Sequence, residues 1–178
     1  MRVLFAALFA AGLLATPAQA AVTAASPSAF IIQNEINVSA SPEQAWRALT
    51  QVGNWWNGDH TYSRDAHNLT LDARAGGCWC ERWGHNSVEH MHVVMVMERG
   101  GIRTLRMVGA LGPLQEMGAR GFMTFTVTPR ASGAKVTFAY RVIGDPALGL
   151  DHVAPAVDGV LMEQMARLAR YTDRGSPN

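Results

Sequence analysis

The stretch GGCWCERWG places a carboxylate between two tryptophans. If it is a β-strand, Trp79, Glu81 and Trp83 point to one face, because side chains two residues apart share a side. A carboxylate buried between indole rings has a raised pKa unless a cation such as Arg106 or Arg141 reaches it. A group with a shifted pKa is suited to proton transfer, so Glu81 is a candidate for acid–base chemistry; a surface glutamate or a structural ion pair is the alternative.

Two histidines in the segment EHMH are the other candidates for proton transfer. On a strand, His90 and His92 would share a face, directed either into a pocket or toward solvent. We take His90 as a second candidate catalytic residue and expect His92 to be exposed. The sequence shows no Ser/His/Asp set and no phosphate-binding glycine loop, so an enzyme activity would depend on Glu81 or His90.

Cys78 and Cys80 occupy the opposite face of the same predicted strand. Residues two apart in a strand are separated by about 6.6 Å, whereas a disulfide needs Cβ atoms about 3.5–4.5 Å apart, so a bond requires a departure from regular strand geometry. A zinc site would need further ligands from His85, or from His90 and His92. We interpret the cysteines as small apolar residues and predict no metal and no cofactor, with the disulfide and the metal site as alternatives.

The beginning of the chain has the pattern of a secretory signal peptide, residues 1–20. Arg2 precedes an apolar run over residues 3–15, and Ala18-Gln19-Ala20 has the small-x-small form of a cleavage site. The run is shorter than the roughly 20 residues that span a bilayer. We therefore expect cleavage before Ala21, a periplasmic or secreted protein, and no stable membrane insertion; an uncleaved anchor is the alternative.

The rest of the chain has the length of one domain. We predict a flexible lead at residues 21–28, a domain at residues 29–173 and a disordered tail at residues 174–178. The 15 Lys and Arg residues are balanced by 14 Asp and Glu residues. Without an excess of positive charge, nucleic acid is not an expected partner. The oligomeric state is not indicated.

The expected elements are a strand, a short helix, a run of strands and a long helix. The first strand covers residues 29–38, and Ser41, Pro42 and Gln44 form a capping box that starts a helix reaching about Val52. Residues rich in Val, Thr, Met and aromatics predict antiparallel strands at about 60–65, 68–74, 78–84, 88–98, 102–109, 121–129 and 134–143. From about Ala154 an apolar stripe with helical spacing predicts a helix on one sheet face, and hence an α+β fold.

Short motifs carry a family resemblance across the first half of the predicted domain. They are Ser41-Pro42-Glu43, Ala45-Trp46, Leu49-Thr50, Trp55-Trp56, and Gly76-Gly77 followed by Trp79. With the order of the elements, they resemble the START / polyketide-cyclase (SRPBCC, helix-grip) superfamily, most closely the branch named after the activator of a heat-shock ATPase. The resemblance covers about Phe30 to Tyr171. It implies a curved antiparallel sheet wrapped around a long C-terminal helix, with an internal cavity. The cysteines depart from the family pattern, and an exported protein cannot share the cytosolic chaperone role.

The resemblance implies a function as well as a fold. We expect a hydrophobic small molecule (a lipid, a sterol-like or a polyketide-like compound) to bind in the cavity, under a lid at Gly109–Leu114. The predicted binding residues are Trp55, Trp56, His60, Trp79, Glu81, Trp83, Leu111, Leu114, Phe138, Tyr140, Val157 and Leu161. One alternative is a polyketide cyclase, aromatase or dehydrase in which Glu81 or His90 moves protons without a metal. The other is an envelope protein that binds a partner and no ligand.

Overall fold

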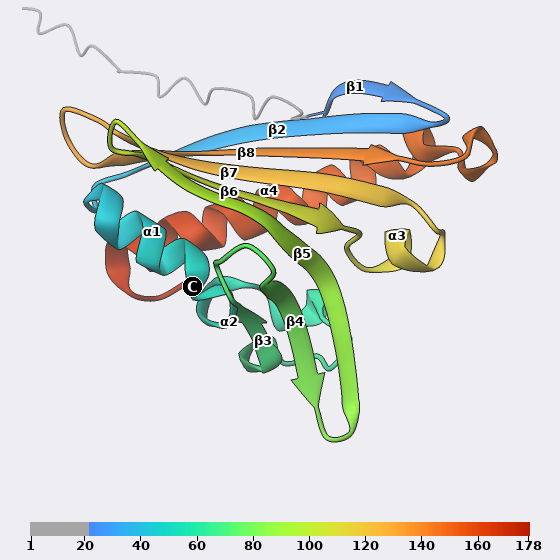
Figure 1. Cartoon of the computed structure of the whole chain (residues 1–178), viewed down its shortest axis with the longest axis horizontal. Helices are drawn as coiled ribbons and strands as arrows, with labels where there is room; N and C mark the ends of the chain where they lie inside the picture. Colours follow the sequence, from blue (N-terminus) through green and yellow to red (C-terminus); the bar gives the residue numbers. More distant parts are fainter. Residues whose placement is uncertain (1–21) are drawn as a thin grey trace, which may run out of the picture.

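A computed structural model describes residues 22–178, so the predicted signal peptide lies outside the described residues. One antiparallel sheet has the strand order β1-β2-β8-β7-β6-β5-β4-β3. The strands are β1 (Val22–Ser26), β2 (Ala29–Val38), β3 (Leu69–Leu71), β4 (Cys78–Trp83), β5 (Asn86–Arg99), β6 (Ile102–Gly109), β7 (Arg120–Pro129) and β8 (Ala134–Ile143). Among the strands of residues 22–178, only β2 and β8 pair although they are far apart in the chain (Figure 1).

Four α-helices accompany the sheet in the described part of the chain. They are α1 (Pro42–Thr50), α2 (Val52–Trp55), α3 (Pro113–Glu116) and α4 (Leu150–Arg174). The predicted capping box is present at α1: the Ser41 side chain accepts from the Gln44 N–H, and the Gln44 side chain accepts from the Ser41 N–H. The helix therefore starts where its sequence satisfies two otherwise unpaired amides.

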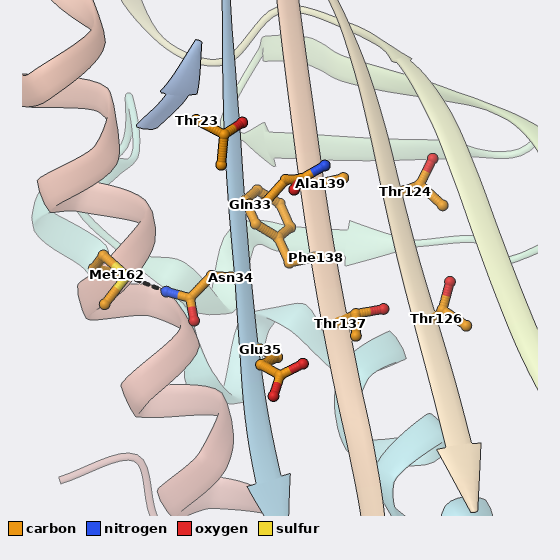
Figure 2. A pocket seen from close by; sticks show the side chains of 10 residues that line it. All are labelled: Thr23, Gln33, Asn34, Glu35, Thr124, Thr126, Thr137, Phe138, Ala139 and Met162. Atoms are coloured by element: carbon orange, nitrogen blue, oxygen red, sulfur yellow. Dashed lines mark hydrogen bonds between the residues drawn. The ribbon is translucent and has the colours of Figure 1, made fainter. Parts of the chain in front are cut away.

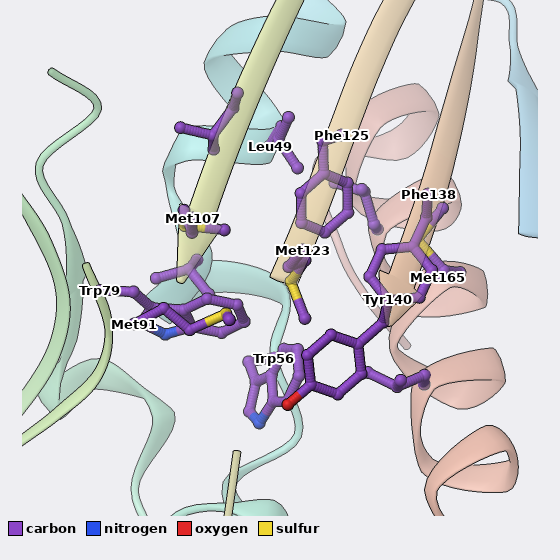
Figure 3. Packing of buried hydrophobic residues seen from close by; sticks show 14 of the residues in the cluster. Leu49, Trp56, Trp79, Met91, Met107, Met123, Phe125, Phe138, Tyr140 and Met165 are labelled. Atoms are coloured by element: carbon purple, nitrogen blue, oxygen red, sulfur yellow. The ribbon is translucent and has the colours of Figure 1, made fainter. Parts of the chain in front are cut away.

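The long helix α4 crosses one face of the sheet, which gives the predicted α+β helix-grip fold (Figure 1). It packs on β1, β2, α1 and α2. At the α1 end of this face, apolar side chains fill the space between helix and sheet (Figure 3). We call this region the filled end and define it by Leu49, Phe125, Val127, Val136 and Leu168, all of which are buried.

Two β-bulges bend β5 away from α4. The pairing with β4 passes from Trp79↔Met91 to Cys80↔Glu89, which leaves His90 as an extra residue. The pairing with β6 skips Val94 in the same way. Because a bulge bends its strand, β5 carries β4 and β3 away from the helix (Figure 1). A gap opens where this bent part of the sheet faces the first half of α4.

Three details differ from the sequence prediction. Residues 60–65 do not form a strand; short 3-10 helices occupy Gly58–His60 and Ala66–Asn68, because Asn57 and Asp65 cap them with side-chain oxygens. The predicted flexible lead contains β1, which pairs with β2. The tail predicted to be disordered folds back on α4, where the Arg170 side chain donates to the carbonyl of Pro177.

Candidate ligand-binding site

A cavity of about 480 Å³ lies in the gap between the bent strands and α4. Its walls come from the segment after α2, from β4 and β5, from the loop around α3, and from the first half of α4. The lining residues are Trp56, Asp59, His60, Thr61, Tyr62, Leu69, Trp79, His90, Leu111, Gly112, Pro113, Leu114, Met117, Val153, Ala156, Val157, Val160 and Leu161. We call this region the hollow end. Most of its lining is apolar, which favours a hydrophobic guest.

The two candidate catalytic residues meet at the wall of this cavity. The Nε2 atom of His90 lies 3.0 Å from a carboxylate oxygen of Glu81. Glu81 is fully buried and also accepts the backbone N–H groups of Tyr62 (3.1 Å) and Ser63 (2.6 Å). His90 lines the cavity, whereas Glu81 lies behind the histidine and does not line it. The geometry therefore places the imidazole toward a guest and the carboxylate as its support.

The hydrogen bonds determine the charge of Glu81. Burial raises its pKa, but hydrogen bonds from Ser63, Tyr62 and His90 outweigh the burial and hold the pKa below its usual range. The sequence-based expectation of a raised pKa was therefore wrong. Neither Arg106 nor Arg141 is needed to stabilise the Glu81 carboxylate, because backbone N–H groups donate to it. No sequence pattern reveals such donors.

Burial also lowers the pKa of His90, although its hydrogen bond with Glu81 and the charge of that residue oppose the shift. At neutral pH the structure thus favours a neutral imidazole beside a carboxylate. In that state Nε2–H donates to Glu81 and Nδ1 is left as a hydrogen-bond acceptor. His90 therefore offers one hydrogen-bond-accepting nitrogen, while its other ring nitrogen is held by Glu81.

Aromatic rings hold His90 in place. The Trp79 ring packs edge-on against Trp56 with centroids 4.9 Å apart, and the Trp79 and His90 centroids are 6.4 Å apart. Tyr62 also stacks on His90, with ring centroids 5.9 Å apart. The Nε1 atom of Trp79 is buried and has no hydrogen-bond partner among the described residues. The wall is thus closely packed, and its one donor without a partner among the described residues is the indole N–H of Trp79.

The loop around α3 covers one side of the cavity, as predicted for residues 109–114. Tyr140 is fully buried, and its hydroxyl accepts the N–H of Leu111 at 3.3 Å. Burial raises the pKa of Tyr62, with further contributions from the nearby charges of Glu116 and Glu81, so its hydroxyl stays protonated and donates to the carbonyl of Gly112. The loop is therefore tied to β8 and to the segment after α2.

Beside this loop, two glycines let the backbone of β6 and β7 lie close to Tyr140 and to the carbonyl of His90. Gly109 and Gly121 face each other across β6 and β7. A Cβ atom on Gly121 would lie 2.4 Å from the ring of Tyr140, and one on Gly109 would lie 2.3 Å from the carbonyl oxygen of His90. Both values are far below ordinary contact distances, so only glycine fits next to Tyr140 and beneath the bulge.

The structure separates the predicted binding residues into two groups. Trp56, His60, Trp79, Leu111, Leu114, Val157 and Leu161 line the cavity. Trp55, Phe138 and Tyr140 belong to the packed core, and Glu81 lies behind His90. Trp83 is only partly buried and sits at the far end of β4, opposite Asn86, because the strand extends past the cavity into its turn.

Other lining residues were not among the predicted contacts. Val153, Ala156 and Val160 lie on the same stripe of α4 as Val157 and Leu161, so the helical spacing of small apolar residues could have identified them. At the mouth, His60 Nε2 lies 3.2 Å from a carboxylate oxygen of Glu163. No sequence pattern indicated that pair, because its members are 103 positions apart.

The cysteines and His92 differ from expectation as well. Cys78 and Cys80 form a disulfide, so their interpretation as small apolar residues was wrong. The β4–β5 pairing is irregular at this point, and the two Cα atoms are 5.5 Å apart, within the range for a disulfide. His92 is exposed, as predicted, but it does not share a face with His90, because the bulge turns both His90 and Met91 inward.

A second hollow, of about 600 Å³, lies around β2, β7 and β8. Figure 2 shows the side chains of Thr124, Thr126 and Thr137 along β7 and β8, while Asn34 points to Met162 of α4 and donates to its sulfur. The threonines lie on the sheet face opposite the buried Phe125 and Val127. This hollow is bordered by neutral hydroxyls and amides with Glu35, and it contains no titratable pair like that of Glu81 and His90.

The comparisons with known proteins agree with this architecture. The sequence profile of the family described as "Polyketide cyclase / dehydrase and lipid transport" matches residues 29–173. The chain belongs to this family. The Polyketide cyclase / dehydrase and lipid transport family fits the SRPBCC resemblance seen in the sequence, whereas the branch related to the heat-shock-ATPase activator stays a prediction. No curated protein matches the chain.

Solved structures share the fold of this family member at low sequence identity. A truncated norcoclaurine synthase from Thalictrum flavum has a TM-score of 0.54 at 14% identity, over 84% of this chain and 96% of that one. A hypothetical protein from Helicobacter pylori has a TM-score of 0.54 at 15% identity, over 93% and 99%. A conserved protein of unknown function from Enterococcus faecalis has a TM-score of 0.54 at 13% identity, over 83% and 74%. At these identities the likeness concerns the fold alone.

Proposed function

We propose that this protein binds a predominantly apolar small molecule, of lipid, sterol-like or polyketide-like character, at the hollow end. The observation that carries the proposal is the cavity of about 480 Å³, with an apolar lining and a single buried polar pair at its wall. Pockets of this size and character hold drug-sized guests. Among the described residues, no helix has the length and apolar character to cross a membrane.

The polar pair defines the part of the guest that reaches the wall. With Nε2–H donated to Glu81, the Nδ1 atom of His90 accepts a hydrogen bond. A guest hydroxyl, phenolic or enolic, would meet this requirement, and its apolar body would rest on Trp56, Leu161 and Val157. The proposed guest therefore combines an apolar skeleton with a hydroxyl group.

A second function is favoured by the contact between Glu81 and His90. In a cyclase or dehydrase of polyketide-like compounds, Nδ1 of His90 would take a proton from a carbon next to a carbonyl, and the Glu81 carboxylate would stabilise the resulting imidazolium. The contact of 3.0 Å and the fixed orientation suit this role. Norcoclaurine synthase, which shares the fold, has been solved in complex with a transition state analogue. The precedent applies at the level of the fold.

The proposal includes a location outside the cytoplasm. It is supported by the signal-peptide pattern of residues 1–20 in the sequence. Expression of the full chain in a Gram-negative host, followed by fractionation and sequencing of the new N-terminus, tests it. A mature protein starting near Ala21 in the periplasmic fraction is the expected result, and an uncleaved cytoplasmic chain would contradict it.

Native mass spectrometry of gently purified protein tests the binding function, with identification of any molecule released by extraction. Val157→Arg places a charge in the cavity, whereas Val94→Arg, on an exposed valine of β5, is the matched control. We expect the wild type and Val94→Arg to carry the guest and Val157→Arg to lose it. Equal retention by Val157→Arg, or a wild type that binds none of a panel of lipids and polyketides, would overturn the proposal.

The two functions separate at His90. His90→Gln keeps a donor to Glu81 but removes the basic nitrogen. If the protein only binds, the variant retains the guest with a modest loss of affinity. If it is an enzyme, the extracted guest is converted by the wild type and remains unchanged with His90→Gln. A molecule that neither protein converts argues against the enzyme.

The third interpretation, partner binding without a ligand, would use a different surface of the protein. Val94, Val96, Met97 and Ile102 are exposed on β5 and β6, away from the cavity lining. Binding of a partner there would be disturbed by Val94→Arg and unaffected by Val157→Arg, the reverse of the pattern expected for the cavity.

A further inference from the structure

The bulge at His90 sorts the neighbouring side chains onto two faces. It turns His90 and Met91 into the protein, so Glu89 and His92 both remain on the outside although they are three residues apart. Opposite them on β4, Cys80 pairs with Glu89 and Cys78 pairs with His92. Two sulfurs, a carboxylate and an imidazole are thus gathered on the outer face of β4 and β5, away from the cavity.

The distances within this group are short. The sulfur atoms of Cys78 and Cys80 and a carboxylate oxygen of Glu89 all lie within 4.8 Å of one another. The Nδ1 atom of His92 is 3.4 Å from a carboxylate oxygen of Glu89, and both side chains are about half exposed. Zinc ligands lie about 2.0–2.3 Å from the ion, so the two sulfurs, once separated, and Glu89 could reach one ion, with His92 joining through its contact to Glu89. The group is therefore compact, with Glu89 and His92 exposed, Cys78 partly buried and Cys80 buried.

We propose that Cys78, Cys80, Glu89 and His92 form a redox-gated site for a zinc-like cation, which binds when the cysteines are reduced. Two thiolates, one imidazole and one carboxylate are a donor set that zinc accepts in tetrahedral geometry. In the disulfide form described here the sulfurs are bonded to each other and cannot act as thiolates. The guanidinium of Arg82, 3.9 Å from the sulfur of Cys78, supports a thiolate before the metal arrives.

The gating step balances as ordinary thiol–disulfide chemistry. A dithiol reductant gives two electrons and two protons to the Cys78–Cys80 disulfide and leaves as its own disulfide. The cation then displaces the two thiol protons and binds both sulfurs. In the reverse direction a disulfide oxidant removes two electrons from the thiolates, the sulfur–sulfur bond forms, and the cation leaves.

Titration of the protein with Co²⁺ and Zn²⁺ tests the site, before and after reduction with a water-soluble phosphine. Cobalt reports on the ligands through the near-ultraviolet charge-transfer absorption of cobalt–thiolate bonds. We expect one equivalent of Co²⁺ to bind to reduced protein with this absorption, to be displaced by Zn²⁺, and to be absent from oxidised protein. Reduced protein that shows no stoichiometric binding, or oxidised protein that binds equally well, would overturn the proposal.

Variants identify the ligands. Cys80→Ser removes a thiolate, while Glu89→Gln and His92→Ala change exposed residues whose replacement leaves the core intact. Because even the loss of an outer-shell partner costs about 10–100-fold in metal affinity, each ligand variant should weaken binding by at least about tenfold. His85→Ala, at an exposed histidine in the β4–β5 turn, is the matched control and should bind like the wild type. Unchanged affinity in both Glu89→Gln and His92→Ala would reduce the site to the two cysteines and contradict the assignment. Circular dichroism confirms that each reduced variant is folded.

Discussion

The two ends of the space between α4 and the sheet have similar residue types and opposite outcomes. At the filled end, Leu49 and Phe125 lie close together in the packed core (Figure 3), and Leu168 is fully buried in the same cluster. At the hollow end, the equally apolar Leu111, Val157 and Leu161 surround about 480 Å³ of space. Hydrophobicity alone therefore does not distinguish a core from a pocket.

Backbone geometry accounts for the difference. α4 packs along β1 and β2, while the bulges at His90 and Val94 bend β5 away from it. The helix residues facing the gap are small, with Val153, Ala156 and Val160 among them. Side chains from β5 and from α4 do not fill the space between them, so a cavity forms where the bent strand faces a helix with short side chains.

The largest expected effect comes from matched leucine truncations at the two ends. Leu168→Ala removes a fully buried side chain from close packing and should cost about 2–5 kcal/mol in the free energy of unfolding. Leu111→Ala, in the partly buried lining of the cavity, should cost less than about 1 kcal/mol, because its neighbours already face open space. Urea unfolding of the guest-free proteins measures both. Equal costs would mean that the hollow end is packed like the filled end.

The next effect concerns the glycines that shape the border of the hollow end. Gly121→Ala forces a methyl group against the ring of Tyr140 and should destabilise the protein by about 1–3 kcal/mol. Gly159→Ala, on α4 with no atom within 4 Å of the new methyl group, should instead stabilise it by about 0.4–1 kcal/mol. Thermal unfolding gives the sign for each variant. A neutral Gly121→Ala would show that Tyr140 can move without cost.

The buried polar pair should make the hollow end sensitive to acid. The pKa values of Glu81 and His90 are both lowered in the folded protein, so the unfolded chain binds more protons and stability falls as the pH falls. His90 contributes stability above its ordinary pKa of about 6.5, lost as the pH falls toward its lowered folded value. Glu81 contributes stability above its ordinary range near about 4.3, lost as the pH falls through its own lowered value.

Two variants separate these contributions in melting curves measured from pH 8 to pH 3. His90→Gln should flatten the upper part of the acid decline, and Glu81→Gln the lower part. Glu81→Gln should also cost about 1–3 kcal/mol at neutral pH, because the amide cannot replace the carboxylate for both backbone donors and His90. A wild-type profile that rises toward acid would contradict the assigned directions.

The smallest expected effect is at the loop over the cavity. Tyr62→Phe removes the hydroxyl that donates to Gly112 and should change the free energy of unfolding by no more than about 0.5 kcal/mol. It should nevertheless speed release of a bound guest, measured by dilution of the loaded protein. Tyr171→Phe loses a hydroxyl that contacts Gln51 and Asn54, away from the cavity, and should leave release unchanged. Equal release rates for the two variants would show that the loop is not held by Tyr62.

Much of the fold followed from local sequence patterns. The capping box at Ser41 set the start of α1, and the alternation in β7 and β8 gave those strands within a residue or so. The segment between Gly58 and Asn68 was mistaken for a strand, because side-chain caps from Asn57 and Asp65 compete with extended structure. Patterns of period two or 3.6 do not reveal such local hydrogen bonds.

The site was harder to predict than the fold. Glu81 and His90 were chosen from their sequence surroundings, and the structure brings them together. The bulge that does so adds one residue to β5, which is why His90 and His92 do not share a face as the sequence had suggested. The backbone N–H groups of Tyr62 and Ser63, which donate to Glu81 and keep it ionised, could not be predicted, since almost any residue type provides a backbone N–H.

The pairing of β2 with β8 has a consequence for how the chain folds. Every other strand pairs with its neighbour in sequence, so β3 to β8 can assemble as successive hairpins. β2 must instead wait for a strand about 100 positions further along, with ten residue pairs to form. Closing so long a loop is entropically costly and slow. The side of β2 that pairs with β8, with Phe30 and Ile32 on its buried face, therefore stays uncovered until β8 has been made and can reach it.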